Sequence, residues 1–214
     1  MSTALAIFVK TPSLSPVKTR LAQSIGEEKA VEFFMLCLDA IKETAKKIDA
    51  DIIWAVAEKD GISNPLWSDF KTIHTGEGSL GERQDHIYST LLNTYERVFL
   101  SCADAPQLCP YIFQEANDAL NDNDFVIGPA HDGGYYLFGG RKPVERNIWT
   151  NVPWSTEETR TKLVERLPSV PAHLQMFSDV DRQADLHYLR SEMPEKMSDQ
   201  QRKIVNWITE NGFN

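Results

Sequence analysis

The stretch ERVFLSCADAP, from Glu96 to Pro106, decides how the rest of the chain is interpreted. Its apolar run ends in small residues, Asp104 and a proline, an order typical of a buried strand that leads into a loop. In an open parallel α/β sheet, ligands bind outside the carboxyl ends of the strands, so Asp104 is a candidate for chemistry. The alternative is that Asp104 only braces the turn before the proline.

The composition is that of an ordinary globular protein of 214 residues, with 42% hydrophobic and 25% charged residues. A net charge of -9 argues against a broad basic face for nucleic acid or anionic membranes. The three cysteines show no zinc spacing and fit a reducing cytoplasm. Because the first apolar run is short and has no basic region before it, we expect neither a signal peptide nor a membrane anchor. No feature indicates an oligomeric state.

Further apolar runs predict a single α/β domain with a mostly parallel central sheet flanked by helices. We predict strands at 4–9, 51–57, 71–75, 125–127 and 135–138, a long helix at 26–48, and helices that begin near 80 and 110. In the second half we predict a polar linker at 141–153, a helix from a cap at Ser155 or Thr156 to about 166, an edge strand within 170–177, and helices at 182–189 and 197–211.

The segment after the first strand, residues 10–21, holds two prolines and three basic side chains and is predicted to be a loop. Lys10, Lys18 and Arg20 could converge on a di- or triphosphate, with backbone amides assisting. The segment is not a glycine-rich P-loop. The alternative is a solvated basic loop.

A second candidate for phosphate or base binding is the glycine-rich segment 75–83. Glycines that open a helix allow close backbone approach to a ligand, and Gly81 and Arg83 lie in the predicted first turn. Glycine turns before helices are also common for structural reasons alone.

The segment 128–136, GPAHDGGYY, predicts a loop between two strands. Asp132 could be a general base, a metal ligand or an acceptor for a sugar hydroxyl, and Tyr135 or Tyr136 could stack on a ring. The alternative for Asp132 and Gly133 is a tight hairpin with an Asp-Gly turn. His131 and Gly134 are not explained by that turn.

Two late acids, Asp179 and Asp181, stand at alternate positions after a possible strand and could chelate a divalent cation. Asp181 could equally be the N-cap of the helix that begins at Arg182.

Together these motifs resemble a bacterial family of glycosyltransferase-like proteins of the GT-A fold, labelled DUF2064 and grouped with nucleotide-diphospho-sugar transferases. The resemblance spans nearly the whole chain. The matching motifs are Lys10-Thr11-Pro12, Lys18 to Leu21, Leu80 to Arg83, Asp104-Ala105-Pro106, Gly128 to Tyr136, Trp154 to Thr156, and Asp179 to Asp181. The chain departs from the family at Ser15-Pro16 and at Cys102, where members tend to carry glycine.

The resemblance implies a Rossmann-like GT-A fold, with a nucleotide-binding half at about 1–106 and an acceptor-side half at about 107–214. It implies a metal-dependent glycosyltransferase that takes a nucleotide-diphospho-sugar and an unknown acceptor. We expect Mg²⁺ or Mn²⁺ on Asp104 and Asp181, with Asp104 and Asp132 in catalytic roles. The substrate side is assigned to His131, Gly133, Gly134, Tyr135 and Trp154.

Two other functions stay open. Looser relatives of the family are nucleotidyltransferases, which take a nucleoside triphosphate and release pyrophosphate. The departures at Cys102 and Ser15-Pro16 also allow a nucleotide-binding protein with weakened catalysis.

Overall fold

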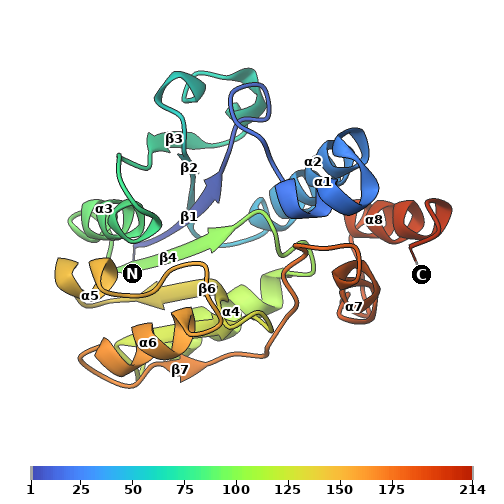
Figure 1. The fold of residues 1–214 in the computed structure, drawn as a ribbon. Helices are drawn as coiled ribbons and strands as arrows, with labels where there is room; N and C mark the ends of the chain where they lie inside the picture. Colours follow the sequence, from blue (N-terminus) through green and yellow to red (C-terminus); the bar gives the residue numbers. More distant parts are fainter. Residues whose placement is uncertain (1, 214) are drawn as a thin grey trace.

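One seven-stranded sheet runs through the computed structural model, which describes residues 2–213 (Figure 1). The strand order is β3-β2-β1-β4-β6-β5-β7, and all neighbours are parallel except the two pairs that involve β6. The strands are β1 (Thr3–Val9), β2 (Asp51–Val56), β3 (Lys71–His74), β4 (Arg97–Cys102), β5 (Phe125–Pro129), β6 (Tyr135–Gly140) and β7 (Ala172–His173). The expected single α/β domain with a mostly parallel sheet is confirmed.

Helices cover both faces of the sheet. They are α1 (Thr19–Ile25), α2 (Glu27–Ala45), α3 (Leu80–Leu92), α4 (Pro110–Ala119), α5 (Arg146–Thr150), α6 (Thr159–Arg166), α7 (Asp185–Ser191) and α8 (Asp199–Glu210), with short 3-10 helices at Lys59–Gly61 and Pro65–Trp67. The core against one face includes side chains of α2 and α4, and the core against the other includes side chains of α3, α5 and α6. A third cluster joins α1, α2, α7 and α8.

The central strands are apolar on both sides because they are buried on both sides. In β1, Leu5 and Ile7 belong to the core beneath α2, while Ala4 and Ala6 belong to the core beneath α3. The register pairs Phe8 of β1 with Cys102 of β4. The two loops that follow these strands therefore leave the same edge of the sheet side by side.

Several predicted boundaries in the second half were wrong. The predicted linker contains α5, because Trp149 is fully buried against the sheet and orders this segment. Strand β5 continues through Gly128-Pro129, where a turn was predicted, by pairing with β6 across a register shift. The predicted edge strand is only the two residues of β7, with an isolated bridge between Ala130 and Phe177.

Two helix starts were also placed too early. Helix α6 begins at Thr159, because Ser155 has a positive φ of 62° and the chain turns there before it can become helical. Helix α7 begins at Asp185. The side chain of Asp185, and not that of Asp181, accepts hydrogen bonds from the backbone before the helix. Its Oδ2 accepts from Asp181 N at 2.9 Å and from Arg182 N at 2.6 Å. In the first half, α1 already begins at Thr19, inside the predicted loop.

Within residues 2–213, no helix combines the length and the apolar character that crossing a membrane requires.

Candidate functional site

A buried lysine joins two carboxylates at the edge where β1 and β4 end. Lys18 Nζ lies 2.8 Å from Asp104 Oδ1 and 3.8 Å from Asp179 Oδ1. It also donates a hydrogen bond to the carbonyl oxygen of Val180 at 2.6 Å. The Lys18 side chain is only 3% exposed, whereas those of Asp104 and Asp179 are 37% and 27% exposed. Solvent therefore reaches parts of both acid side chains, though not Asp179 Oδ1, and hardly reaches the ammonium group.

The backbone of Lys18 is strained. It stands just before α1 with φ 47° and ψ 41°, in the left-handed region that side chains other than glycine rarely adopt. The loop before it is anchored at buried Thr11, whose N–H donates to Glu58 and whose Oγ1 accepts from Trp67 Nε1. Lys18 thus adopts a costly backbone conformation in which its side chain contacts the acid pair, as is common at functional sites.

The charges at this site do not balance. Burial lowers the pKa of Lys18, but the carboxylates of Asp104 and Asp179 outweigh burial and raise it, so the lysine stays protonated. Burial raises the pKa of Asp179 to about 7, and the negative charges of Asp104, Asp181 and Asp132 add to this effect while Lys18 opposes it. One ammonium group does not neutralise the surrounding acids.

The raised pKa of Asp179 predicts that stability falls as pH rises. Between the ordinary aspartate pKa of about 4 and pH 7, the folded protein binds more protons at this residue than the unfolded chain does. In EDTA at pH 8, Asp179→Asn should therefore be more stable than the parent by at most about 4 kcal/mol, because folding raises the pKa of Asp179 from about 4 to about 7. Urea unfolding at pH 8 and pH 5 measures this.

The gain in the free energy of unfolding of Asp179→Asn over the parent should be smaller at pH 5, where Asp179 of the parent is already protonated. A variant that is less stable than the parent at both values would show that the carboxylate is favourably partnered and would contradict this assignment of charge.

Asp181, the predicted second metal ligand, is instead paired with Arg20 across the solvent-exposed mouth of the loop. Asp104 and Asp179 both contact Lys18, whereas Asp181 contacts Arg20. Lys10 is exposed just after β1, outside this contact. The structure thus joins Lys18 to Asp104 and Arg20 to Asp181, and leaves Lys10 to solvent.

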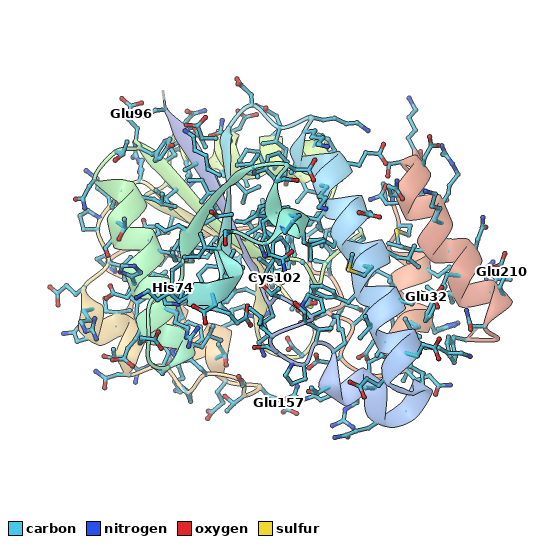
Figure 2. The ribbon with its side chains drawn as sticks, turned by 90° about the horizontal axis from the view of Figure 1, so that it is seen from above. Glu32, His74, Glu96, Cys102, Glu157 and Glu210 are labelled. Atoms are coloured by element: carbon cyan, nitrogen blue, oxygen red, sulfur yellow. The ribbon has the colours of Figure 1, made fainter. Side chains whose placement is uncertain are left out.

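Two cysteines lie close to the acids. Burial raises the pKa of the Cys102 thiol, and the negative charges of Asp104 and Asp179 raise it further. Burial likewise raises the pKa of Cys37, on α2. Figure 2 draws Cys102 in the middle of the molecule, far from labelled peripheral residues such as Glu210. A thiol held in its protonated form is a poor nucleophile, which favours a structural role for Cys102.

The loop between β5 and β6 is a tight turn, which is the alternative that the sequence left open. Asp132 is exposed, and its Oδ1 accepts a hydrogen bond from Gly134 N at 2.8 Å. The neighbouring His131 is exposed, and its N–H donates to Phe177 O at 3.0 Å. Asp132 is near enough to raise the pKa of Asp179, so the turn adds a fourth acid to the edge of the site.

Gly133 of this turn cannot carry a side chain, for two reasons. Its φ is +89°, and an added Cβ would lie 2.1 Å from the carbonyl oxygen of Glu157. Gly26 has nearly the same φ, +90°, with nothing within 4 Å. We expect Gly26→Ala to cost about 1 kcal/mol and Gly133→Ala about 3 kcal/mol, because only the second adds a backbone clash to the strain.

Thermal unfolding of the two alanine variants tests this difference, with Gly26→Ala as the matched control. Equal losses of stability in the two variants would mean that the backbone around Glu157 moves easily to make room for a side chain. The need for glycine at position 133 would then come from a ligand and not from packing.

The remaining predicted residues mostly make structural contacts. Tyr135 donates to Gln84 Oε1, and burial raises its pKa. Trp154 Nε1 donates a hydrogen bond to Trp149 O at 2.7 Å. Gly81 packs against this hydrogen bond, and a Cβ added to it would lie 2.3 Å from Trp154 Nε1 and 2.3 Å from Trp149 O. Arg83 Nη1 donates to Ala57 O and to Thr75 Oγ1, which braces the ends of β2 and β3.

The acid pair suits a hard divalent cation. Carboxylate oxygens are the preferred ligands of Mg²⁺ and Mn²⁺. Asp179 Oδ1 is buried without a hydrogen-bond partner, and excess negative charge surrounds it. Among residues 2–213, no group of three or more histidine, cysteine or acidic side chains is arranged as a metal site, so a bound cation would take other ligands from phosphate or water.

Fold and site together define an α/β protein with a lysine-bridged acid pair at the carboxyl edge of its sheet. The chain belongs to the family described as "Uncharacterized protein conserved in bacteria (DUF2064)", whose model matches residues 40–156, more than half of the chain. The matched range includes Asp104 and the turn at Asp132 but neither Lys18 nor Asp179. No curated protein sequence matches the chain.

Solved structures share this fold. A provisionally assigned nucleotide-diphospho-sugar transferase from Desulfovibrio desulfuricans G20 is 26% identical, with a TM-score of 0.85 over 99% of this chain and 97% of that one. A CMP:2-keto-3-deoxy-manno-octonic acid synthetase complexed with CTP is 12% identical, with a TM-score of 0.53 over 89% and 98%. A manganese complex of Rv0371c from Mycobacterium tuberculosis H37Rv is 11% identical, with a TM-score of 0.50 over 96% and 99%. The last two likenesses concern the fold alone.

Proposed function

We propose that this protein is a metal-dependent glycosyltransferase that takes its sugar from a nucleotide-diphospho-sugar. The observation that carries the proposal is the contact of Lys18 with Asp104 and Asp179 at the carboxyl edge of the sheet. It is supported by the match, over nearly the whole chain, to a structure provisionally assigned as a nucleotide-diphospho-sugar transferase. We place the nucleotide in the half that ends near residue 106 and the acceptor in the half that follows.

The chemical demand of this reaction is the negative charge that develops on the departing nucleoside diphosphate. Mg²⁺ or Mn²⁺ held by Asp104 and Asp179 would neutralise part of that charge. Lys18 stays protonated and supplies a fixed positive charge to the same phosphates, and exposed Lys10 and Arg20 extend that charge along the loop.

The acceptor side is assigned to the turn between β5 and β6. Asp132 is exposed there, so it could hold an acceptor hydroxyl or take its proton. Its hydrogen bond with Gly134 N fixes the direction of the carboxylate. We assign the larger part of this role to positioning of the acceptor hydroxyl.

The test is a panel of nucleoside diphosphates, nucleotide-diphospho-sugars and nucleoside triphosphates, each with and without Mn²⁺. We expect metal-dependent stabilisation by nucleotide-diphospho-sugars and slow release of nucleoside diphosphate from them. Stabilisation by none of the panel would contradict the proposal.

A nucleotidyltransferase is the second candidate, because a lysine beside an acid pair serves a departing pyrophosphate equally well and the fold is shared with the CTP-bound synthetase. Release of pyrophosphate from a nucleoside triphosphate would select it. Binding without any product would select a nucleotide-binding protein with weakened catalysis, an outcome that the side chain of Cys102 beside the acids favours.

A further inference from the structure

Glu192, at the end of α7, is the centre of a polar network that joins three loops around the acid pair. Its Oε2 accepts from Ser178 N at 2.6 Å, and its Oε1 accepts from Ser178 Oγ at 2.8 Å. Gln107 Nε2 donates to Glu192 Oε2 at 3.1 Å, and His131 Nε2 lies 3.6 Å from Oε1. One carboxylate therefore contacts the loops after β4, β5 and β7.

The network fixes the backbone on one side of Asp179. Ser178 precedes it, and besides its two bonds to Glu192 its carbonyl oxygen accepts from Gln107 Nε2 at 2.7 Å. On the other side, the carbonyl oxygen of Val180 accepts from Lys18. Asp179 is thus held between two anchored residues, which limits how far its carboxylate can move from that of Asp104.

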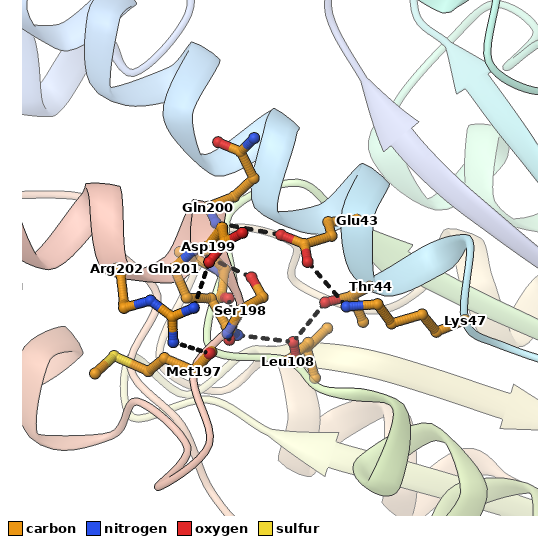
Figure 3. A network of polar contacts seen from close by, with 11 residues as sticks. Glu43, Thr44, Lys47, Leu108, Met197, Ser198, Asp199, Gln200, Gln201 and Arg202 are labelled. Carbon is orange, nitrogen blue, oxygen red and sulfur yellow. Dashed lines mark hydrogen bonds and ion pairs between the residues drawn. The ribbon is translucent and has the colours of Figure 1, made fainter.

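The network is buried at Ser178 and Gln107, is exposed at His131, and also reaches the loop that carries Asp104. Gln107 is 1% exposed and stands three residues after Asp104. The same loop is held from its other side by Gln201 of α8, whose Nε2 donates to Pro106 O at 2.9 Å and to Leu108 O at 3.2 Å (Figure 3). Hydrogen bonds in so dry an environment are strong, and losing one partner leaves the others unsatisfied.

We propose that Glu192 is a positioning residue that holds Asp179 at a set distance from Asp104 and thereby sets the affinity of the site for divalent cations. The identity of the ligand rests on the proposed function, whereas the positioning rests on the contacts alone. Residues that orient metal ligands in this way typically change metal affinity 10- to 100-fold when they are replaced.

Glu192→Gln tests the proposal, because it keeps the shape but turns one accepting oxygen into a donor that faces other donors. The matched control is Glu43→Gln, which alters a carboxylate between α2 and α8 that accepts hydrogen bonds from Lys47 Nζ and Gln200 N (Figure 3). In Glu192→Gln we expect faster amide hydrogen exchange at residues 177–181 and about tenfold weaker Mn²⁺ binding. In Glu43→Gln neither should change.

Ser178→Ala removes only the hydrogen bond from the Ser178 hydroxyl to Glu192 Oε1, so it should increase hydrogen exchange and weaken Mn²⁺ binding to a smaller degree. This variant tests the proposal if Glu192→Gln does not fold. Unchanged exchange in both variants would overturn the proposal. So would faster exchange with unchanged Mn²⁺ affinity, because Glu192 would then be merely structural. A parent protein that binds no Mn²⁺ would contradict the proposed function instead, and hydrogen exchange would still decide whether Glu192 holds the loop.

Discussion

Lys18→Met should destabilise the protein by about 3 kcal/mol at pH 8 in EDTA. Removing the buried partner of an ion pair leaves an uncompensated charge, which typically costs 3–5 kcal/mol. We place the expected loss at about 3 kcal/mol, the lower end of this range, because Asp104 is 37% exposed and water screens it. The substitution does not relieve the backbone strain at position 18, because methionine must adopt the same left-handed φ, so this strain does not reduce the expected loss of stability. Urea unfolding followed by circular dichroism measures the loss.

Lys10→Met is the matched control, because Lys10 belongs to the same loop but is exposed, and it should change stability by no more than about 0.5 kcal/mol. The loss in Lys18→Met should also be smaller at pH 5, where Asp179 is protonated. If Lys18→Met is as stable as Lys10→Met, Lys18 does not compensate the charges of Asp104 and Asp179.

Asp104→Asn should abolish metal-dependent nucleotide binding. A ligand at one hundred times its Kd adds about 2.7 kcal/mol of stability, which corresponds to a rise in Tm of roughly 5–10 °C for a protein of this size. With the best nucleotide and Mn²⁺ from the panel, the parent should show a rise of this order and Asp104→Asn none. Asparagine keeps the shape of the side chain but loses the charge that a divalent cation requires.

Asp118→Asn, on the exposed face of α4, is the control and should keep the full rise in Tm. A rise in Asp104→Asn equal to that of the parent would place the metal elsewhere.

The sequence predicted the sheet and the position of Asp104 because both follow from continuous apolar runs that end in loops. The register of β1 with β4 then brings the basic loop beside Asp104. Local patterns failed where packing decided the outcome. Trp149 orders a helix inside a polar segment, and Gly81 serves the packing of Trp149 and Trp154, a structural need that its motif does not distinguish from phosphate binding.

Site residues that depend on tertiary contacts were hidden from sequence reasoning. Asp179 and Asp181 are equivalent in the sequence pattern, and only the structure pairs Asp181 with Arg20 and directs Asp179 toward Lys18. Glu192 belongs to no motif and stands 14 residues after Ser178. The sequence offered Asp181 as the cap of the following helix, whereas in the structure Asp185 accepts a hydrogen bond from Asp181 N.

The most direct test of the central claim is a titration of Mn²⁺ into the protein with a nucleoside diphosphate present, followed by electron paramagnetic resonance. The parent should bind one Mn²⁺ per chain, Asp104→Asn should bind none, and Asp179→Asn should bind it at least tenfold more weakly. Equal Mn²⁺ binding by the parent and both variants would contradict the assignment of this acid pair as the metal site.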